Sequence, residues 1–201
     1  MEISADVEKK LREKTGVGLM DCKEALRAAD GDMEKAVDFL REKGLAKLAK
    51  RTGRAATEGS ISSYIHTGGK VGAMAEVNCE TDFVAKTDEF QAFVKDVVMQ
   101  ITASNPFYIR REDIPSEVLE REKTIYRNQA RDSGKPEKIL DKIAEGKLEK
   151  FYQEVCLMEQ SFIKNTDITI KELLEELVTK LGENIVIRRF ARFQLGETAE
   201  G

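Results

Sequence analysis

The chain has 201 residues, of which 35% are charged and 41% are hydrophobic. This length fits one domain or two small ones, and the composition is typical of a helix-rich soluble protein with a modest core. The formal net charge is −4, and basic and acidic residues are interleaved along the chain. No broad positive surface is therefore expected, and we expect no direct binding of nucleic acid.

Several other classes of protein are not indicated. No apolar run approaches the roughly 18 residues that a membrane span needs, so we expect a cytoplasmic protein without a membrane partner. The three cysteines are widely spaced and His66 is the only histidine, which indicates neither a disulfide framework nor a zinc site. His66 alone does not make a catalytic triad, and no phosphate-binding glycine motif is present. We expect no enzyme activity, no metal and no cofactor.

Residues 5–44 are predicted to form three short helices, because apolar residues recur at helical spacing. The second helix carries Cys22, Ala25, Leu26 and Ala29 on one stripe, and the third carries Met33, Ala36, Val37 and Leu40. Ser4 is suited to cap the first helix, Asp30-Gly31-Asp32 forms the turn before the third, and Gly44 is suited to end it.

A basic segment of small residues, 47–57, is predicted to be a linker that separates a domain of residues 1–46 from a domain of residues 58–201. The second domain begins with a β-hairpin, since residues 60–66 and 71–80 alternate in polarity around Thr67-Gly68-Gly69-Lys70. The second strand places Val71, Ala73, Ala75, Val77 and Cys79 on one face.

The rest of the chain is predicted to be mostly helical. A long helix carries Phe90, Val94, Val97 and Ile101 on one stripe, and Asn105-Pro106 ends it. Residues 116–158 are charged and turn at Ser133-Gly134-Lys135-Pro136, which indicates an antiparallel helical hairpin. Thr169 and Glu172 form a capping box before a helix that Gly182 ends.

Residues 184–195 are rich in Ile, Val and Phe, and are predicted to join the β-hairpin as a third antiparallel strand. Strands, then helices, then a strand indicate an α+β fold. Arg188, Arg189 and Arg192 are predicted to line a solvated face of that last strand. Cys22, Cys79 and Cys156 are predicted to be small core residues.

Two segments, 11–26 and 76–86, resemble the signature segments of the elongation factor Ts family. The first is Leu-Arg-Glu-Lys-Thr-Gly-Val-Gly-Leu-Met-Asp-Cys-Lys-Glu-Ala-Leu, and the second is Glu-Val-Asn-Cys-Glu-Thr-Asp-Phe-Val-Ala-Lys. The Gly134-Lys135-Pro136 turn and residues 182–189 also match the family pattern. The resemblance implies a ubiquitin-associated-like three-helix domain followed by a core domain with a three-stranded antiparallel sheet, packed against helices and carrying an inserted helical hairpin.

The resemblance also implies a function and a site. Members of this family bind elongation factor Tu carrying GDP, loosen its magnesium and phosphate site, and promote release of GDP and reloading with GTP. By the family pattern Asp82 and Phe83 enter the GTPase, flanked by Thr81 and Val84. Longer members carry two copies of the core subdomain, so a chain with one copy is expected to form a homodimer.

The residues themselves leave alternatives open. Phe83 lies seven positions before Phe90 and could start the buried stripe, whereas a helix start at Thr87 would leave Thr81–Lys86 as an exposed turn. The loop of residues 15–20 could be only a connection, or its apolar end could dock on the GTPase. Two other functions compete: a ubiquitin-associated-type binding module without exchange activity, and a cysteine enzyme that uses Cys79 or Cys156 with His66.

Overall fold

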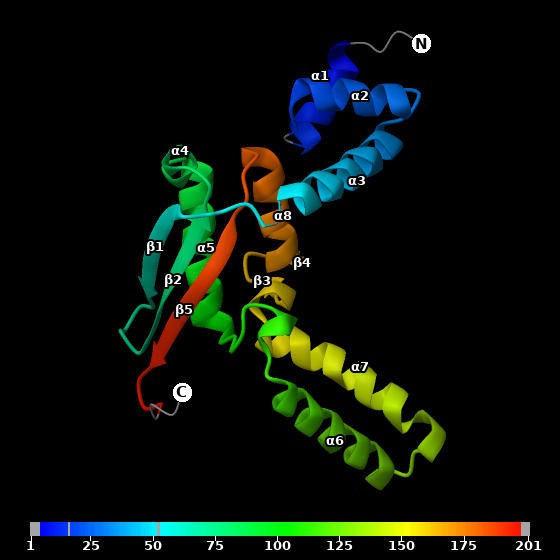
Figure 1. Ribbon diagram of the computed structural model, residues 1–201, viewed down its shortest axis with the longest axis vertical. Coiled ribbons are helices and arrows are strands. Elements are labelled where there is room, and N and C mark those ends of the chain that lie inside the picture. Colours follow the sequence, from blue (N-terminus) through cyan, green and yellow to red (C-terminus); the bar gives the residue numbers. More distant parts are fainter. Residues whose placement is uncertain (1–4, 16, 52, 198–201) are drawn as a thin grey trace. The chain divides into compact units, whose positions relative to one another are not determined.

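The computed structural model describes residues 5–15, 17–51 and 53–197 (Figure 1). The chain divides into two compact units, each built from separate stretches of sequence. The first unit comprises residues up to 59 together with 78–90 and 174–186, and the second comprises 60–77, 91–173 and residues from 187 onwards. The contiguous division into 1–46, 47–57 and 58–201 stays a prediction.

The first unit begins with the three helices that the periodicity predicted. These are α1 (Ala5–Thr15), α2 (Leu19–Ala28) and α3 (Met33–Arg51), and they share one apolar core. Its buried members are Leu11, Cys22, Ala25, Leu26, Ala29, Ala36 and Leu40. The Asp32 Oδ1 atom accepts hydrogen bonds from the backbone N–H of Glu34 (2.9 Å) and Lys35 (3.1 Å), which caps α3. Ser4 lies outside the described residues.

The prediction that Gly44 ends the third helix is wrong, because α3 continues to Arg51. Gly44 is buried, and a Cβ built on it would lie 3.6 Å from Oγ1 of Thr179 in α8 (Ile170–Leu181). Beyond it, Arg51 Nη1 donates to the backbone oxygen of Val178 at 3.0 Å. Glycine weakens a helix by about 1 kcal/mol, and tertiary packing can outweigh that cost. The first part of the predicted linker is therefore helical.

The sheet has the three strands that the sequence predicted, in the order β1 (Glu58–Ile65), β2 (Val71–Cys79) and β5 (Val186–Gln194). Gly68 and Gly69 both have positive φ in the turn, where His66 N–H donates to the Val71 oxygen at 2.9 Å. The predicted inner face of β2 is confirmed for Ala73, Ala75, Val77 and Cys79, which are buried, whereas Val71 at the strand's start is half-buried. The fold is α+β, as predicted.

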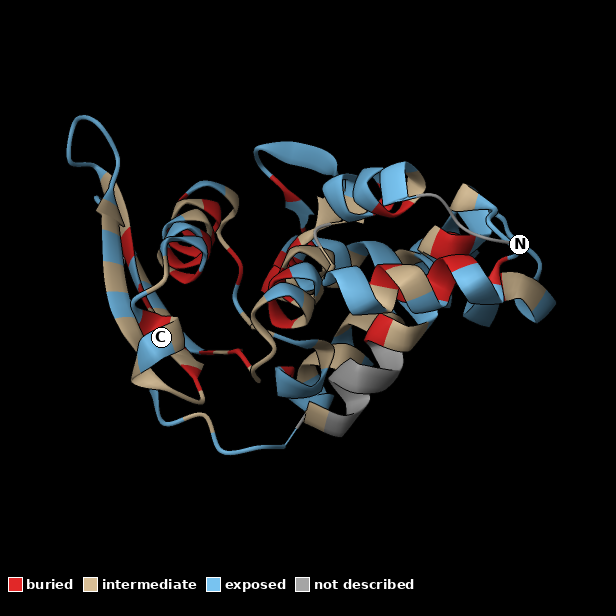
Figure 2. Ribbon diagram, turned by 90° about the horizontal axis from the view of Figure 1, so that it is seen from above, coloured by how far each residue is buried: buried red, intermediate tan, exposed pale blue. Residues whose placement is uncertain are grey.

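The long helix α5 (Asp88–Ser104) lies over one face of the sheet (Figure 1). Its predicted stripe is confirmed: Phe90, Val94, Val97 and Ile101 are all fully buried. Figure 2 colours the buried residues of the chain red. The Thr87 Oγ1 atom accepts from the Phe90 N–H at 3.3 Å, which confirms Thr87 as the predicted N-cap.

The predicted helical hairpin is also confirmed. It consists of α6 (Ser116–Asp132) and α7 (Glu137–Val155), which run antiparallel (Figure 1). The capping box that opens α8 is present, since Glu172 Oε2 accepts from Thr169 N–H (2.8 Å) and Glu172 N–H donates to Thr169 Oγ1 (3.2 Å). Short elements that the sequence did not predict lie around the hairpin's base: η1 (Arg111–Asp113), η2 (Leu157–Glu159), β3 (Ser161–Phe162) and β4 (Asn165–Thr169).

Candidate functional site

The segment from Thr81 to Val84, here called the Thr81–Val84 segment, begins a one-turn helix directly after β2. This helix is α4 (Asp82–Ala85), where a turn was predicted. Thr81 is in an extended conformation (φ −128°, ψ 154°), and its Oγ1 accepts from the Val84 N–H at 3.4 Å. A threonine oxygen in this position satisfies one of the free N–H groups at the helix start.

Phe83 is 80% exposed, whereas Phe90 is fully buried. The two rings are not on one stripe because the chain starts two successive helices, α4 after Thr81 and α5 after Thr87. Between them, Thr87 Oγ1 donates to the Val84 oxygen at 2.8 Å and closes the first helix. The alternative in which Phe83 belongs to the core is therefore wrong. An exposed aromatic ring at a tightly held turn is a candidate contact for a partner.

Asp82 pairs with Lys86 one helical turn further on, at 2.6 Å between Asp82 Oδ2 and Lys86 Nζ. The hydrogen bond from Lys86 holds the pKa of the Asp82 carboxyl below its ordinary value, and the Asp82 carboxylate raises the pKa of Lys86 in turn. The pair is exposed to solvent, so it contributes little to stability. The site thus presents a charged carboxylate beside an exposed aromatic ring.

The most extensive support of the Thr81–Val84 segment comes from Glu183, a residue that sequence reasoning did not single out. Glu183 Oε2 accepts from the backbone N–H groups of Glu80 (3.1 Å) and Thr81 (3.0 Å), and Glu183 Oε1 accepts from the Thr81 hydroxyl (2.6 Å). No local pattern marks Glu183, because its partners lie about 100 positions away in the sequence. Its only signal is its place in the 182–189 segment of the family pattern.

A second set of contacts joins the same two stretches of chain. Glu80 Oε1 accepts from the Asn184 N–H at 2.6 Å, and Asn184 Nδ2 donates to the Arg54 oxygen at 2.8 Å. Arg54 Nη1 lies 3.7 Å from Glu80 Oε2. Hydrogen bonds from side chains of both segments therefore hold the end of β2 and the residues after α8 together.

The cysteines are core residues, as predicted, because all three are buried. Burial, followed by the nearby Glu183 charge, raises the pKa of the Cys79 thiol from 9.0 to about 11, and burial with the Glu159 charge does the same for Cys156. A nucleophilic cysteine needs a lowered pKa and access to solvent. His66 is exposed, with its Nδ1 3.1 Å from the Tyr64 hydroxyl. These environments argue against the cysteine-enzyme alternative.

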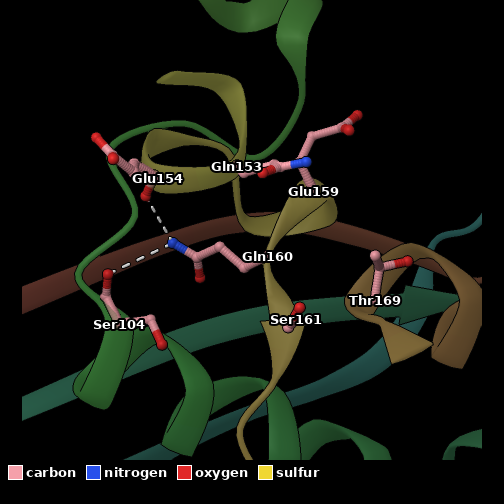
Figure 3. Close-up of a pocket in the computed structure, with 7 residues that line it drawn as sticks. All are labelled: Ser104, Gln153, Glu154, Glu159, Gln160, Ser161 and Thr169. Carbon is pink, nitrogen blue, oxygen red and sulfur yellow. Dashed lines mark hydrogen bonds between the residues drawn. The ribbon is translucent and has the colours of Figure 1, made fainter. Parts of the chain in front are cut away.

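A pocket in the second unit has polar walls (Figure 3). It is lined by Ser104, Gln153, Glu154, Glu159, Gln160, Ser161 and Thr169. The Gln160 amide donates to the backbone oxygens of Glu154 (2.9 Å) and Ser104 (3.4 Å), as Figure 3 shows, so this side chain is used for structure. No group of three or more metal-binding side chains occurs among the described residues.

The prediction that Arg192 lies on a solvated face is wrong. Its Nε donates to the Thr102 oxygen at 3.3 Å, and its side chain is only 10% exposed. Arg188 and Arg189 are exposed as predicted. In the loop of residues 15–20, Leu19 and Met20 are exposed at the start of α2, and docking by this pair stays a prediction. Within the described ranges, no helix is both long enough and apolar enough to cross a membrane.

Comparison with known proteins places these features in a family. The family model described as elongation factor TS matches residues 32–197. The chain is 60% identical to an elongation factor Ts of Carboxydothermus hydrogenoformans over 97% of this chain and 90% of that protein. It is 59% identical to one of Geobacter sulfurreducens (100% and 93%), and 62% identical to one of Desulfosudis oleivorans (97% and 98%). This chain belongs to the elongation factor Ts family, whose members are translation elongation factors.

Proposed function

We propose that this protein is a guanine-nucleotide exchange factor that binds elongation factor Tu carrying GDP, disturbs its magnesium and phosphate site, and promotes GDP release and GTP reloading. The observation that carries the proposal is the exposure of Phe83 on α4, next to the charged Asp82. An aromatic side chain exposed to 80% contributes nothing to the core, and it is available to a partner.

The exchange needs no covalent step, so the protein is proposed not to be an enzyme. It must bind the empty GTPase more tightly than the GDP complex, and linkage then weakens GDP binding by the same factor. An inserted phenylalanine ring shifts the elements around the nucleotide, and magnesium is sensitive to such shifts because it demands near-ideal octahedral geometry. Asp82 adds a negative charge beside the inserted ring. We propose that the protein acts in the cytoplasm, where translation elongation takes place.

The test is the replacement Phe83→Ala, followed by stopped-flow measurement of fluorescent GDP release from elongation factor Tu. We expect the maximal release rate to fall by about tenfold or more, because buried aromatic anchors dominate interfaces. Phe107→Ala is a matched control, since Phe107 is also an exposed phenylalanine (67%) but lies in a loop after α5. An unchanged rate for Phe83→Ala would sink the proposal.

The domain division made from the sequence is also proposed: a ubiquitin-associated-like domain of residues 1–46, a linker of residues 47–57 and a core domain of residues 58–201. The separate apolar core shared by α1, α2 and α3 supports the first domain. Residues 53–57 form neither helix nor strand between α3 and β1, which supports a linker between the two proposed domains.

A homodimer is proposed as the working assembly. Its support is a set of apolar side chains on the sheet that are each more than half exposed, namely Ile61, Ile65, Met74 and Phe193. Exposed apolar patches of this kind mark interaction surfaces in soluble proteins.

A further inference from the structure

We propose that Glu183 is a positioning residue for nucleotide exchange, which holds the Thr81–Val84 segment in the conformation that presents Phe83. This inference rests on the proposed exchange function, since it assigns a role at the same site. Glu183 belongs to the segment after α8, and its carboxylate binds the Thr81–Val84 segment and the residue before it.

The carboxylate receives three hydrogen bonds from two adjacent residues. Two of them come from the backbone N–H groups of Glu80 and Thr81, which directly follow the last residue of β2, Cys79. The third comes from the Thr81 hydroxyl at 2.6 Å. Hydrogen bonds to an ionised acceptor are roughly twice as strong as neutral ones, and three donors leave this carboxylate well satisfied.

The Thr81 hydroxyl connects Glu183 to the first turn of α4 by hydrogen bonds. Its Oγ1 donates to Glu183 Oε1 and accepts from the Val84 N–H, so one atom joins the carboxylate to the first turn of the helix. Because a hydroxyl has a single proton, donation to Glu183 leaves its lone pairs free to cap the helix. The orientation that presents Phe83 therefore depends on Glu183 through the Thr81 hydroxyl.

The rest of Thr81 is held as firmly. Its carbonyl oxygen accepts from the Cys79 thiol (3.2 Å) and from the Ala85 N–H (3.2 Å). Glu183 is itself fixed, since Gly182 has φ +82° after α8 and the Asn184 N–H donates to Glu80. Glu80 and Glu183 thus each use a side chain to bind the backbone of the other's segment, which makes the tie reciprocal.

A pre-organised segment matters for the rate of exchange. If the Thr81–Val84 segment were mobile, ordering it on the GTPase would reduce the free energy left for displacing the magnesium site. Misplacement of a reacting or inserting group by about 1 Å can cost up to 100-fold in rate. Loss of Glu183 should therefore lower the maximal rate of GDP release more than it weakens the encounter with the GTPase, which other surfaces can still support.

The experiment measures the maximal rate of GDP release and the half-saturating concentration of the full-length protein with elongation factor Tu. Glu183→Ala is expected to lower the maximal rate by roughly tenfold while changing half-saturation by less than about threefold. Glu183→Gln is expected to restore most of the rate, because its amide oxygen can accept both backbone N–H groups. Thr81→Val removes the hydroxyl that joins Glu183 to the cap of α4 but keeps the two backbone hydrogen bonds to Glu183, so its rate should fall between those of Glu183→Ala and Glu183→Gln.

Glu89→Ala is the matched control, because Glu89 in α5 pairs with Lys180 in α8 at 3.2 Å, so the substitution also removes an acidic side chain but leaves the hydrogen bonds between Glu183 and Thr81 in place. It should leave the rate as in the wild type. Phe83→Ala serves as the benchmark: if it exchanges normally, the proposed function itself fails. If Phe83→Ala is slow while Glu183→Ala matches the wild type, the function stands and the positioning role is overturned.

Two further outcomes would also overturn the positioning role. Glu183→Gln as slow as Glu183→Ala would mean that the charge acts on the GTPase directly. If Glu183→Ala and Glu89→Ala both lose rate in proportion to a lower melting temperature, the role of Glu183 is a general structural one. Should Glu183→Ala fail to fold, Thr81→Val decides, and a wild-type rate for that variant refutes the proposal.

Discussion

The Cys79 thiol lies at the end of β2, fully buried, and donates to the Thr81 oxygen. Burial raises its pKa from 9.0 to about 11, and the neighbouring Glu183 carboxylate adds to the rise. A group whose pKa is raised by folding stabilises the protein fully below its unfolded value, and that stabilisation is lost as pH rises through the folded value. Cys79 should therefore destabilise the fold between about pH 9 and pH 11.

Cys79→Ala tests this dependence. Between about pH 8 and pH 10.5 the wild-type free energy of unfolding should fall by about 2 kcal/mol more than that of Cys79→Ala, because the variant has no thiol to ionise on unfolding. Urea denaturation at both pH values measures the difference. The variant lowers stability at both pH values through lost packing, so only the change with pH is diagnostic. Equal losses in both proteins would contradict the assigned environment of Cys79.

At the scale of single residues, local chemistry was predictable and distant partners were not. Thr87 could be predicted as an N-cap because its acceptor role depends on residues three positions away. The same sequence left Phe83 open between core and surface, since helical spacing cannot show that one helix stops and another starts. The role of Glu183 could not be predicted for a different reason, because only the fold brings its three hydrogen-bond donors close to it.

Among the elements, the base of the α6–α7 hairpin depends on two buried amides. Gln100 of α5 is fully buried, and its Nε2 donates to Gln160 Oε1 (3.1 Å) while its Oε1 accepts from the Ile163 N–H (2.9 Å). Gln160 in turn donates to the Glu154 oxygen at the end of α7. This network joins α5, α7 and the residues on both sides of β3, and its hydrogen bonds are buried or partly buried.

Gln100→Leu should lower the free energy of unfolding by about 3 kcal/mol, because it keeps the volume but leaves the Ile163 N–H and the Gln160 oxygen without partners. Urea denaturation followed by circular dichroism measures this loss. Gln129→Leu is the control: Gln129 is exposed and its side-chain oxygen accepts an exposed hydrogen bond from Lys147 Nζ (2.7 Å), so the change should stay within about 0.5 kcal/mol. Equal effects of the two substitutions would show that the network adds no stability.

The elements themselves were predictable where a period repeats over several turns. The helices α5 and α8 and the β1–β2 hairpin have such patterns, whereas the α6–α7 hairpin was indicated by its charged residues and its turn. The bounds of all of them fall within a few residues of those predicted. The strands β3 and β4 were missed because a strand such as Ser161–Phe162 is too short to show alternation. The end of α3 was misplaced because contacts of Gly44 and Arg51 with α8, absent from any local pattern, extend the helix.

For the whole molecule, the face of the sheet that points away from α5 is the surface most suited to a second copy. Met74 points away from the buried Ala73 and Ala75. A Cβ on Gly72 would lie 3.2 Å from the Ile65 side chain, which places Ile65 on the face of Met74. Arg189 bonds Glu76 at 2.6 Å on the same face, and Phe193 follows it along β5. Around this ion pair the face carries exposed apolar side chains, which mark interaction surfaces in soluble proteins.

Phe193→Asp should therefore convert a dimer into a monomer. Stable dimers bury about 800 Å² on each partner. A two-fold interface contains the substitution twice, once from each chain, so two carboxylates would be placed among apolar side chains. Light scattering should give about twice 22.6 kDa for the wild type and about 22.6 kDa for the variant. Phe107→Asp, which puts the same charge at an exposed phenylalanine outside the sheet, should remain dimeric. A monomeric wild type would refute the dimer, whereas a dimeric Phe193→Asp would refute only this choice of surface.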